Sequence, residues 1–304
     1  MLRFFAICLT ALMCSGAAFA CNIASDQLRL QVADYVRDGL ICIEAPPDGF
    51  RFDQTVEQAF LSRMNAERKK KGLPPFRLRK TLRPAARFQS LDMGVNAFFG
   101  HESPDGRRAA DRIAAFDRTL LAQSTGENVA VFGPAKCYDQ NDKQVSCLNL
   151  PGLRLPAAID VVDDLHQKLM DSEGHRANIL SADFTHAAVG VARTDSGFYV
   201  TQVFANPVGT LSRPLPTTFE VNADMELSPD LIGWQLGGFT LIDSTGERID
   251  LKTDRLKPLV PGEFTLLVRG ERSSEEERGV RTYVLTEWLS LSGPSFTLSA
   301  AKGS

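Results

Sequence analysis

The chain has 304 residues, 43% of them hydrophobic, and a formal net charge of −3 at pH 7. This length and apolar content allow a sizeable buried core and two domains. The slightly acidic balance argues against nucleic acid as the main partner.

The first twenty residues are typical of a secretory signal peptide. Arg3 gives a basic start, residues 4–13 form an apolar run, and Ala18-Phe19-Ala20 is a cleavage signal. The run is too short to span a bilayer permanently, so we do not expect an integral membrane protein. We expect a secreted or periplasmic chain that begins at Cys21. A lipoprotein signal also places a cysteine there, but the bulky Phe19 and the lack of a leucine-like residue at 18 disfavour it.

The cysteines predict two disulfides in the exported chain. Two of the six lie in the signal segment, which leaves Cys21, Cys42, Cys137 and Cys147. An even number in an exported protein indicates pairing, and three pairings are possible. Proximity in sequence favours Cys21–Cys42 and Cys137–Cys147, each worth roughly 3 kcal/mol by the chain-entropy model. If all four are paired, no thiol is left as a nucleophile.

The first half of the exported chain reads as mostly helical. Residues 21–50 form a disulfide-closed N-terminal segment with a short helix. Apolar residues at every third or fourth position predict helices over 53–71, 80–98 and 109–116, with a turn-rich loop over 99–107. The basic run over 68–71 reads as a helix end whose charges complement the dipole.

The pattern changes from helical to extended along the second half. We expect a helix that starts at Glu127 and another over 157–171, followed by strands over 187–193 and 198–205. Residues 207–216 read as a linker and 273–277 as a charged loop. Short extended runs follow the linker and predict a small all-β sandwich-like domain. The expected organisation is 1–20 signal peptide, 21–50 N-terminal segment, 51–208 main domain and 209–304 C-terminal β domain.

Five motifs stand in order along the main domain: Asn65-Ala66-Glu67-Arg68, Gly100-His101 with Ser103-Pro104-Asp105-Gly106, Gly126-Glu127-Asn128, Gly174-His175-Arg176-Ala177-Asn178-Ile179-Leu180, and Thr201-Gln202-Val203-Phe204. Together they resemble the CAP superfamily of cysteine-rich secretory, antigen 5 and pathogenesis-related proteins. The likeness is strongest to its bacterial secreted, SCP-like branch and covers about residues 53–206.

The resemblance implies an α+β fold, a three-layer α-β-α sandwich, here followed by the small β domain. It also implies a solvent-open cavity lined by two histidines and two acidic residues. His101, Glu127 and His175 match three of these positions. The fourth acid falls near Ser172, where Glu173 and Asp171 are adjacent substitutes, and Asp111 is a further possibility.

The residue types make chemical sense without the family. Two neutral imidazoles, His101 and His175, are ligands for Zn²⁺ or another divalent metal, and the Glu127 carboxylate adds charge or holds a bound water. The alternative is that Glu127 only favours a helix start and that the histidines only hold loops. Asn128 and Asn178 are expected to pin loops.

The remaining polar candidates read as structural. His166 and His186 have no partnering motif and are expected at the surface or at an element boundary. Ser103 stands in a Ser-Pro-Asp-Gly turn and not in a nucleophile elbow.

Three functions remain open. The favoured one is an exported CAP-domain protein that binds a metal ion, a small apolar molecule, a lipid or a partner protein, with little or no catalysis. The second is a metal-assisted hydrolase of peptide or cell-envelope bonds with Glu127 as general base, although no His-Glu-x-x-His motif is present. The third is an adhesive protein in which the β domain engages the partner.

Overall fold

The structure is a computed structural model that describes residues 21, 23, 29–133, 137–138, 144–145, 156–221, 223–251, 260–278 and 281–300. The predicted signal peptide and Cys147, and with it the Cys137–Cys147 disulfide, lie outside these residues. The helices are α1 (Val32–Glu44), α2 (Gln54–Lys70), η1 (Lys80–Leu82), α3 (Arg83–Val95), α4 (Ala109–Phe116), α5 (Ala158–Asp171) and α6 (Glu173–Leu180).

Strands make up the rest of the regular structure. They are β1 (Arg51–Phe52), β2 (Arg77–Leu78), β3 (Leu120–Phe132), β4 (Cys137–Tyr138), β5 (Gln144–Val145), β6 (His186–Arg193), β7 (Phe198–Leu211), β8 (Thr218–Glu220), β9 (Pro229–Leu231), β10 (Gln235–Asp243), β11 (Arg248–Leu251), β12 (Gly262–Arg278) and β13 (Arg281–Ser299). The strands β10, β11, β12 and β13 pair with one another in antiparallel fashion.

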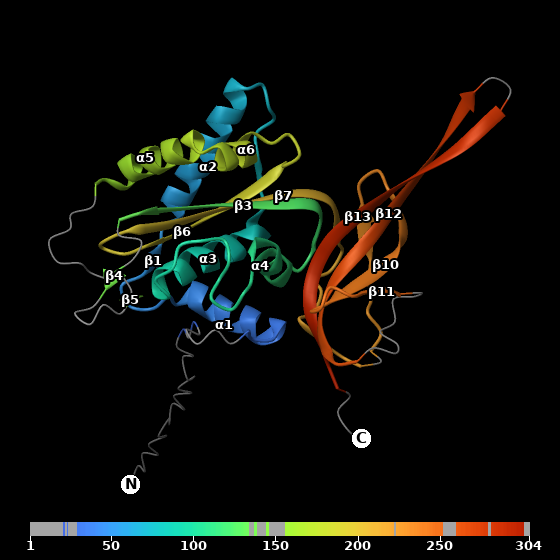
Figure 1. Cartoon of the computed structure of the whole chain (residues 1–304), viewed down its shortest axis with the longest axis horizontal. Helices are drawn as coiled ribbons and strands as arrows, with labels where there is room; N and C mark the ends of the chain where they lie inside the picture. The colour runs from blue at the N-terminus through green and yellow to red at the C-terminus, as the bar shows by residue number, and fades with distance from the viewer. Residues whose placement is uncertain are drawn as a thin grey trace, which may run out of the picture.

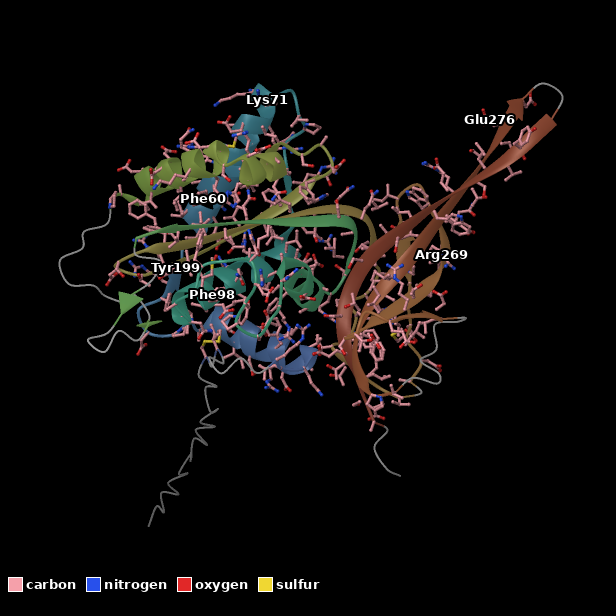
Figure 2. All side chains as sticks on the ribbon, in the orientation of Figure 1. Phe60, Lys71, Phe98, Tyr199, Arg269 and Glu276 are labelled. Carbon is pink, nitrogen blue, oxygen red and sulfur yellow. A yellow bond between two sulfur atoms is a disulfide. The ribbon has the colours of Figure 1, made fainter. Side chains whose placement is uncertain are left out.

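Helices cover both faces of the sheet formed by β3, β6 and β7 (Figure 1). On one face α2, α5 and α6 bury Phe60 and Leu165 against Phe204. On the other face α1, α3 and α4 bury Phe116 against Tyr199 and its neighbours, and Figure 2 labels Phe60 and Tyr199 on these opposite sides. Burial of two apolar faces by amphipathic helices gives the predicted α+β, three-layer architecture.

One continuous sheet joins the helical half to the C-terminal strands. Its order is β1-β6-β7-β3-β13-β12-β10-β11, and β13 meets β3 where Ser292 pairs with Ala122. Arg118 reinforces this junction by donating hydrogen bonds to Ser295 O at 2.6 Å and Leu215 O at 2.9 Å. Burial lowers the pKa of Arg118 to about 10, so the guanidinium is still charged at neutral pH.

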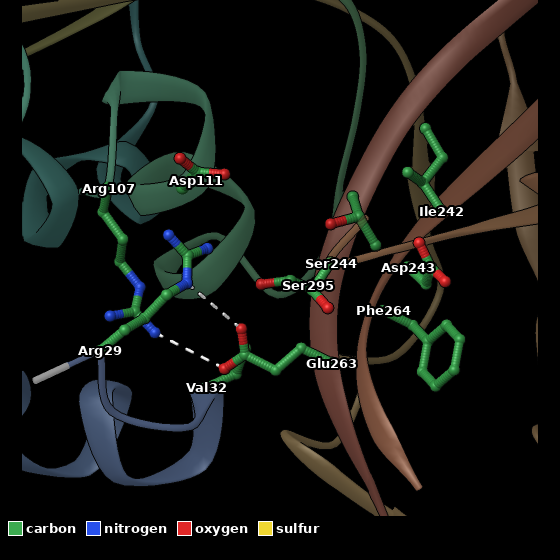
Figure 3. A pocket seen from close by; sticks show the side chains of 11 residues that line it. Arg29, Val32, Arg107, Asp111, Ile242, Asp243, Ser244, Glu263, Phe264 and Ser295 are labelled. Atoms are coloured by element: carbon green, nitrogen blue, oxygen red, sulfur yellow. Dashed lines mark ion pairs between the residues drawn. The ribbon is translucent and has the colours of Figure 1, made fainter. Parts of the chain in front are cut away.

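A charged cavity of about 180 Å³ lies beside the same junction. Glu263 on β12 forms ion pairs across it with Arg107 at 3.6 Å and with Arg29 at 3.5 Å (Figure 3). Arg107 is buried and also lies 4.0 Å over the Tyr35 ring. The ion pairs therefore connect the loop before α4 to the C-terminal strands.

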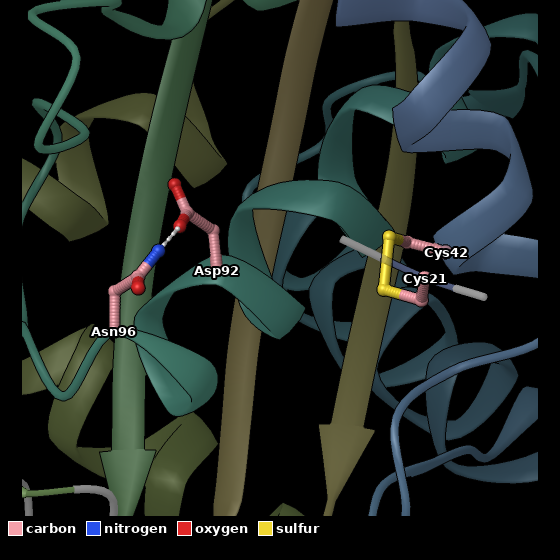
Figure 4. The surroundings of a disulfide bond; sticks show 4 residues. All are labelled: Cys21, Cys42, Asp92 and Asn96. Atoms are coloured by element: carbon pink, nitrogen blue, oxygen red, sulfur yellow. Dashed lines mark hydrogen bonds between the residues drawn. A yellow bond between two sulfur atoms is a disulfide. The ribbon is translucent and has the colours of Figure 1, made fainter. Parts of the chain in front are cut away.

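The predicted Cys21–Cys42 disulfide is present and joins Cys21 to α1 (Figure 4). It closes a loop whose ends are 21 residues apart in sequence. Cys42 is fully buried in the core between α1 and α3. The disulfide therefore attaches Cys21 to the helical layer that contains α1 and α3.

Helices α2, α4 and α5 confirm the predictions from apolar periodicity. The helix predicted to start at Glu127 is wrong, because residues 120–132 form β3 and pair with β7 throughout. Val129 and Val131 recur at a spacing of two, which is the period of a strand, and pairing with a long neighbour decides the outcome. Among the described residues, no helix combines the length and the apolar character needed to cross a membrane.

Two predicted loops are also strands. The linker over 207–216 is wrong in its first half, since β7 continues to Leu211 and Pro207 sits opposite Ala122 at an irregularity in the register, a position where a strand tolerates proline. The charged loop over 273–277 is wrong, because these residues pair with 282–286 in the projecting β12–β13 hairpin. Both faces of that hairpin meet solvent, so no apolar alternation marks it. The division of the chain into domains stays a prediction.

Candidate functional site

The fold brings together three predicted site residues that are far apart in sequence. His101 lies in the loop after α3, Glu127 on β3 and His175 on α6. His101 Nδ1 lies 3.0 Å from Glu127 Oε1. The His101 and His175 ring centroids are 6.5 Å apart, with the ring planes inclined at 52°.

Arg112 on α4 is the charged partner beneath this cluster. Its Nη2 donates to Glu127 Oε1 at 3.0 Å and to Oε2 at 2.8 Å. The two side chains are 1% and 2% exposed. A buried carboxylate is tolerated when it is paired in this way, so Arg112 makes the position of Glu127 possible.

Arg112 also holds the loop that carries His101. Its Nη2 donates to the carbonyl of His101 at 2.9 Å, and its Nη1 donates to the carbonyl of Arg107 at 2.8 Å and to Ser103 Oγ at 3.2 Å. One guanidinium therefore fixes both the histidine loop and the carboxylate that faces it. Arg112 is not among the site residues predicted from the sequence.

Helix α3 anchors the loop from the other side. Gln89 Nε2 donates to Gly100 O at 2.8 Å, and Ser103 Oγ donates to Gln89 Oε1 at 3.0 Å. Behind them lies the buried Asp92, which accepts a hydrogen bond from Asn96 at 2.6 Å (Figure 4). Burial raises the pKa of Asp92 to about 6, although the hydrogen bond from Asn96 acts in the opposite direction.

Two asparagines fasten α6 to β3. Asn128 Nδ2 donates to the carbonyl of His175 at 3.1 Å, and Asn178 Nδ2 donates to the carbonyl of Glu127 at 3.1 Å. Asn178 Nδ2 also donates to Asn128 Oδ1 at 2.9 Å. They were expected to pin loops, but they join a helix to a strand and so hold His175 next to β3.

The acids proposed for the fourth position lie elsewhere. Glu173 is exposed at the first position of α6. Asp171 accepts a hydrogen bond from Gln167, and Asp111 accepts one from the backbone of Arg108 at the start of α4. Within the described residues, no hydrogen bond or ion pair connects these acids to His101, Glu127 or His175. The charged side chain that completes the cluster is a cation, Arg112.

The two histidine rings lie close together but further apart than two ligands of one metal ion. An ionised carboxylate only accepts hydrogen bonds, so the proton of His101 is on Nδ1 and Nε2 is free to bind a metal. When two histidine rings bind one tetrahedral Zn²⁺, their ring centroids lie about 5 Å from each other. The observed distance is 6.5 Å, so a shared ion would require a shift of the His101 ring, whose side chain is 54% exposed.

The protein supplies only part of such a coordination sphere. In the described part of the chain, no group of three or more His, Cys, Asp or Glu side chains is arranged to hold a metal ion. Water molecules would therefore complete the sphere around His101 and His175. Burial, followed by repulsion from His101, lowers the pKa of His175. His175 is consequently neutral, as a ligand must be, over a wider pH range than a free histidine.

The two other histidines lie outside the cluster. His166 was predicted at the surface, which is wrong: it is 6% exposed, on the face of α5 that packs toward α2. Its Nε2 lies 4.0 Å from Glu67 Oε1, and burial lowers its pKa. His186 is half-buried at the start of β6, with Nδ1 2.9 Å from Thr185 Oγ1.

Comparison with known proteins places the site in a family. Residues 61–204 match the model of the cysteine-rich secretory protein family, CAP. They include the whole cluster, from His101 to His175. This segment of the chain is therefore a CAP domain.

Individual relatives are similar over about half of the chain. YkwD, an uncharacterized protein of Bacillus subtilis strain 168, is 32% identical over 148 residues, which are 49% of this chain and 46% of that protein. An extracellular SCP-domain protein of Bacillus anthracis is 25% identical with a TM-score of 0.38, over 51% of this chain and 41% of its own. An outer surface protein of Borrelia burgdorferi is 16% identical with a TM-score of 0.38, over 52% of this chain and 98% of its own. The chain thus spans less than half the length of the first two.

Proposed function

We propose that this chain is an exported CAP-domain protein that binds a divalent metal ion such as Zn²⁺ through His101 and His175 and has little or no catalytic activity. The observation that carries the proposal is the hydrogen bond from His101 Nδ1 to Glu127. A carboxylate behind a histidine fixes its tautomer and is the usual support of a metal-binding imidazole. A bound Zn²⁺ would supply a positive charge for an anionic or polar ligand. Export rests on the predicted signal peptide.

Calorimetric titration of the metal-free protein with ZnCl₂ tests the site. His101→Ala and His175→Ala are each expected to weaken binding by at least about tenfold, because each removes one of two protein ligands. The matched control is His186→Ala, which removes a half-buried histidine from the start of β6 and should leave affinity within about twofold. Wild-type affinity in both site variants would eliminate the metal site.

The same titration should depend on pH. Ligating imidazoles must be neutral, so affinity is expected to fall as the pH drops below about 6. The pKa of His175 is lowered, so its protonation contributes at lower pH than that of an unperturbed histidine. NMR titration of the His175 imidazole checks that its pKa is lowered. Loss of Zn²⁺ affinity only well above pH 7 would contradict histidine protonation as the cause.

The hydrolase alternative receives less support from the geometry. Arg112 occupies both Glu127 oxygens, His101 approaches one of them, and the carboxylate is 2% exposed. Glu127 therefore orients a histidine and presents no free oxygen to a water molecule. Turnover of peptide and peptidoglycan substrates should not differ between wild type and Glu127→Gln. Hydrolysis that disappears in this variant would restore the alternative.

A further inference from the structure

Trp288 is a large aromatic side chain left open on the solvent face of the C-terminal strands. It lies on β13 opposite Glu271 and is 59% exposed. A Cβ added to Gly237 of β10 would lie 3.4 Å from Trp288 Cζ3. The indole therefore rests against backbone that carries no side chain.

Arg269 of β12 lies over the indole ring. Its guanidinium lies 5.6 Å from the Trp288 ring, and Nη2 donates to Gly237 O at 2.9 Å. A Cβ at Gly238 would lie 2.9 Å from the same nitrogen, and Gly238 has φ +141°, a value that favours glycine. The register of β10 against β12 shifts between Leu236 and Gly238. A β-bulge and two glycines thus make room for the indole and for the guanidinium that lies over it, and we call this pair the platform (Arg269 is labelled in Figure 2).

The platform borders a hollow of about 370 Å³. Polar groups surround it: Thr240 Oγ1 donates to Asp250 Oδ1 at 2.6 Å, and Ser290 adds a hydroxyl. Arg248 is exposed at the rim and makes no hydrogen bond or ion pair with the described residues. A flat apolar surface with hydroxyl, carboxylate and guanidinium groups at its edge is complementary to a sugar ring, which has an apolar C–H face and a polar edge.

We propose that this hollow binds an acidic polysaccharide. A pyranose ring stacks on Trp288, and the carboxylate of the sugar pairs with the guanidinium of Arg248, the geometry that arginine recognises best. Arg269 positions the indole. The site lies on the C-terminal strands and needs neither a metal nor the His101 cluster.

Affinity electrophoresis and calorimetry of the full-length chain with polygalacturonate test the proposal, with neutral dextran as the comparison. Wild type should bind polygalacturonate and not dextran. Trp288→Ala should weaken binding by roughly tenfold or more, since it removes the stacking surface. Arg248→Ala should weaken it by roughly fivefold or more, through loss of the charge pair.

Two further variants separate the site from general effects on the strands. Trp234→Ala removes the other tryptophan, which packs over Gly270 on the opposite face of the sheet, and should leave affinity within about twofold. Gly237→Val keeps the indole but displaces it and should weaken binding as Trp288→Ala does.

Several outcomes overturn the proposal: no binding of polygalacturonate by wild type, equal binding of dextran, or full affinity in Trp288→Ala or Arg248→Ala. Near-ultraviolet circular dichroism confirms that each variant is folded. Zn²⁺ titration of Trp288→Ala keeps the two proposals distinguishable, because the metal affinity should be that of wild type.

Discussion

Replacing Arg112 with methionine is expected to lower the free energy of unfolding by ~3–5 kcal/mol, because it leaves the buried Glu127 carboxylate without its countercharge. The side chains of both residues are almost fully buried, so solvent screening cannot replace the ion pair. The change also removes the donors to the carbonyls of His101 and Arg107. Urea denaturation followed by circular dichroism measures the loss.

A second variant distinguishes an unpaired charge from lost packing. In the double variant Arg112→Met/Glu127→Gln neither position carries a buried charge, and a substantial part of the lost stability should return. Arg108→Met is the matched control, since this neighbouring arginine is 74% exposed and pairs with Glu102 at the surface, where such pairs contribute about 0–1 kcal/mol. An Arg112→Met protein within about 1 kcal/mol of wild type would contradict the role given to this ion pair.

Much of the fold could be predicted from apolar periodicity, and the site from ordered motifs. The period of α2 and α5 is clear because each buries one face against the sheet. The segment around Glu127 was mistaken for a helix because the pairing partner that makes it a strand, β7, lies about 70 residues further along the chain. Local patterns cannot report such distant pairing.

The acid chosen next to His175 illustrates a limit of reasoning from sequence proximity. Residues two positions apart on a helix are rotated by about 200° and point to opposite sides. Glu173 therefore faces solvent, while His175, on the same helix α6, lies close to His101. Arg112 did carry a usable signal, since it shares a helix face with the apolar Ile113 and Phe116. A cation on the buried face of a helix predicts a buried acid opposite it.

Of the motif glycines at positions 100, 126 and 174, close packing requires only Gly126. A Cβ at Gly126 would lie 2.8 Å from the Phe184 ring, so glycine is needed there for close approach. At Gly100 and Gly174 an added Cβ would meet no neighbouring group within 4 Å, so close packing does not require glycine at these two positions.

Arg68 is the second buried arginine on which the site depends. The basic run over 68–71 does end helix α2, as predicted, and within it Arg68 is 1% exposed. It donates to Pro74 O at 2.7 Å and to three carbonyls after or at the end of α6, those of Ile179, Ser181 and Phe184, at 3.1, 2.6 and 3.2 Å. One side chain of α2 thus satisfies the backbone that ends the His175 helix.

Arg68→Met is therefore expected to lower the free energy of unfolding by ~3–5 kcal/mol, because several buried carbonyls lose their donor and each unsatisfied group costs about 1–3 kcal/mol before relaxation. Arg68→Lys keeps the charge but offers a point donor in place of the planar fork, so its loss should be smaller. Lys70→Met, on the same helix and exposed, should change stability by less than about 0.5 kcal/mol. Denaturant titration gives the three values, and hydrogen exchange of the α6 amides locates the effect. If α6 kept wild-type protection in Arg68→Met, the carbonyl contacts would not be what holds the His175 helix in place.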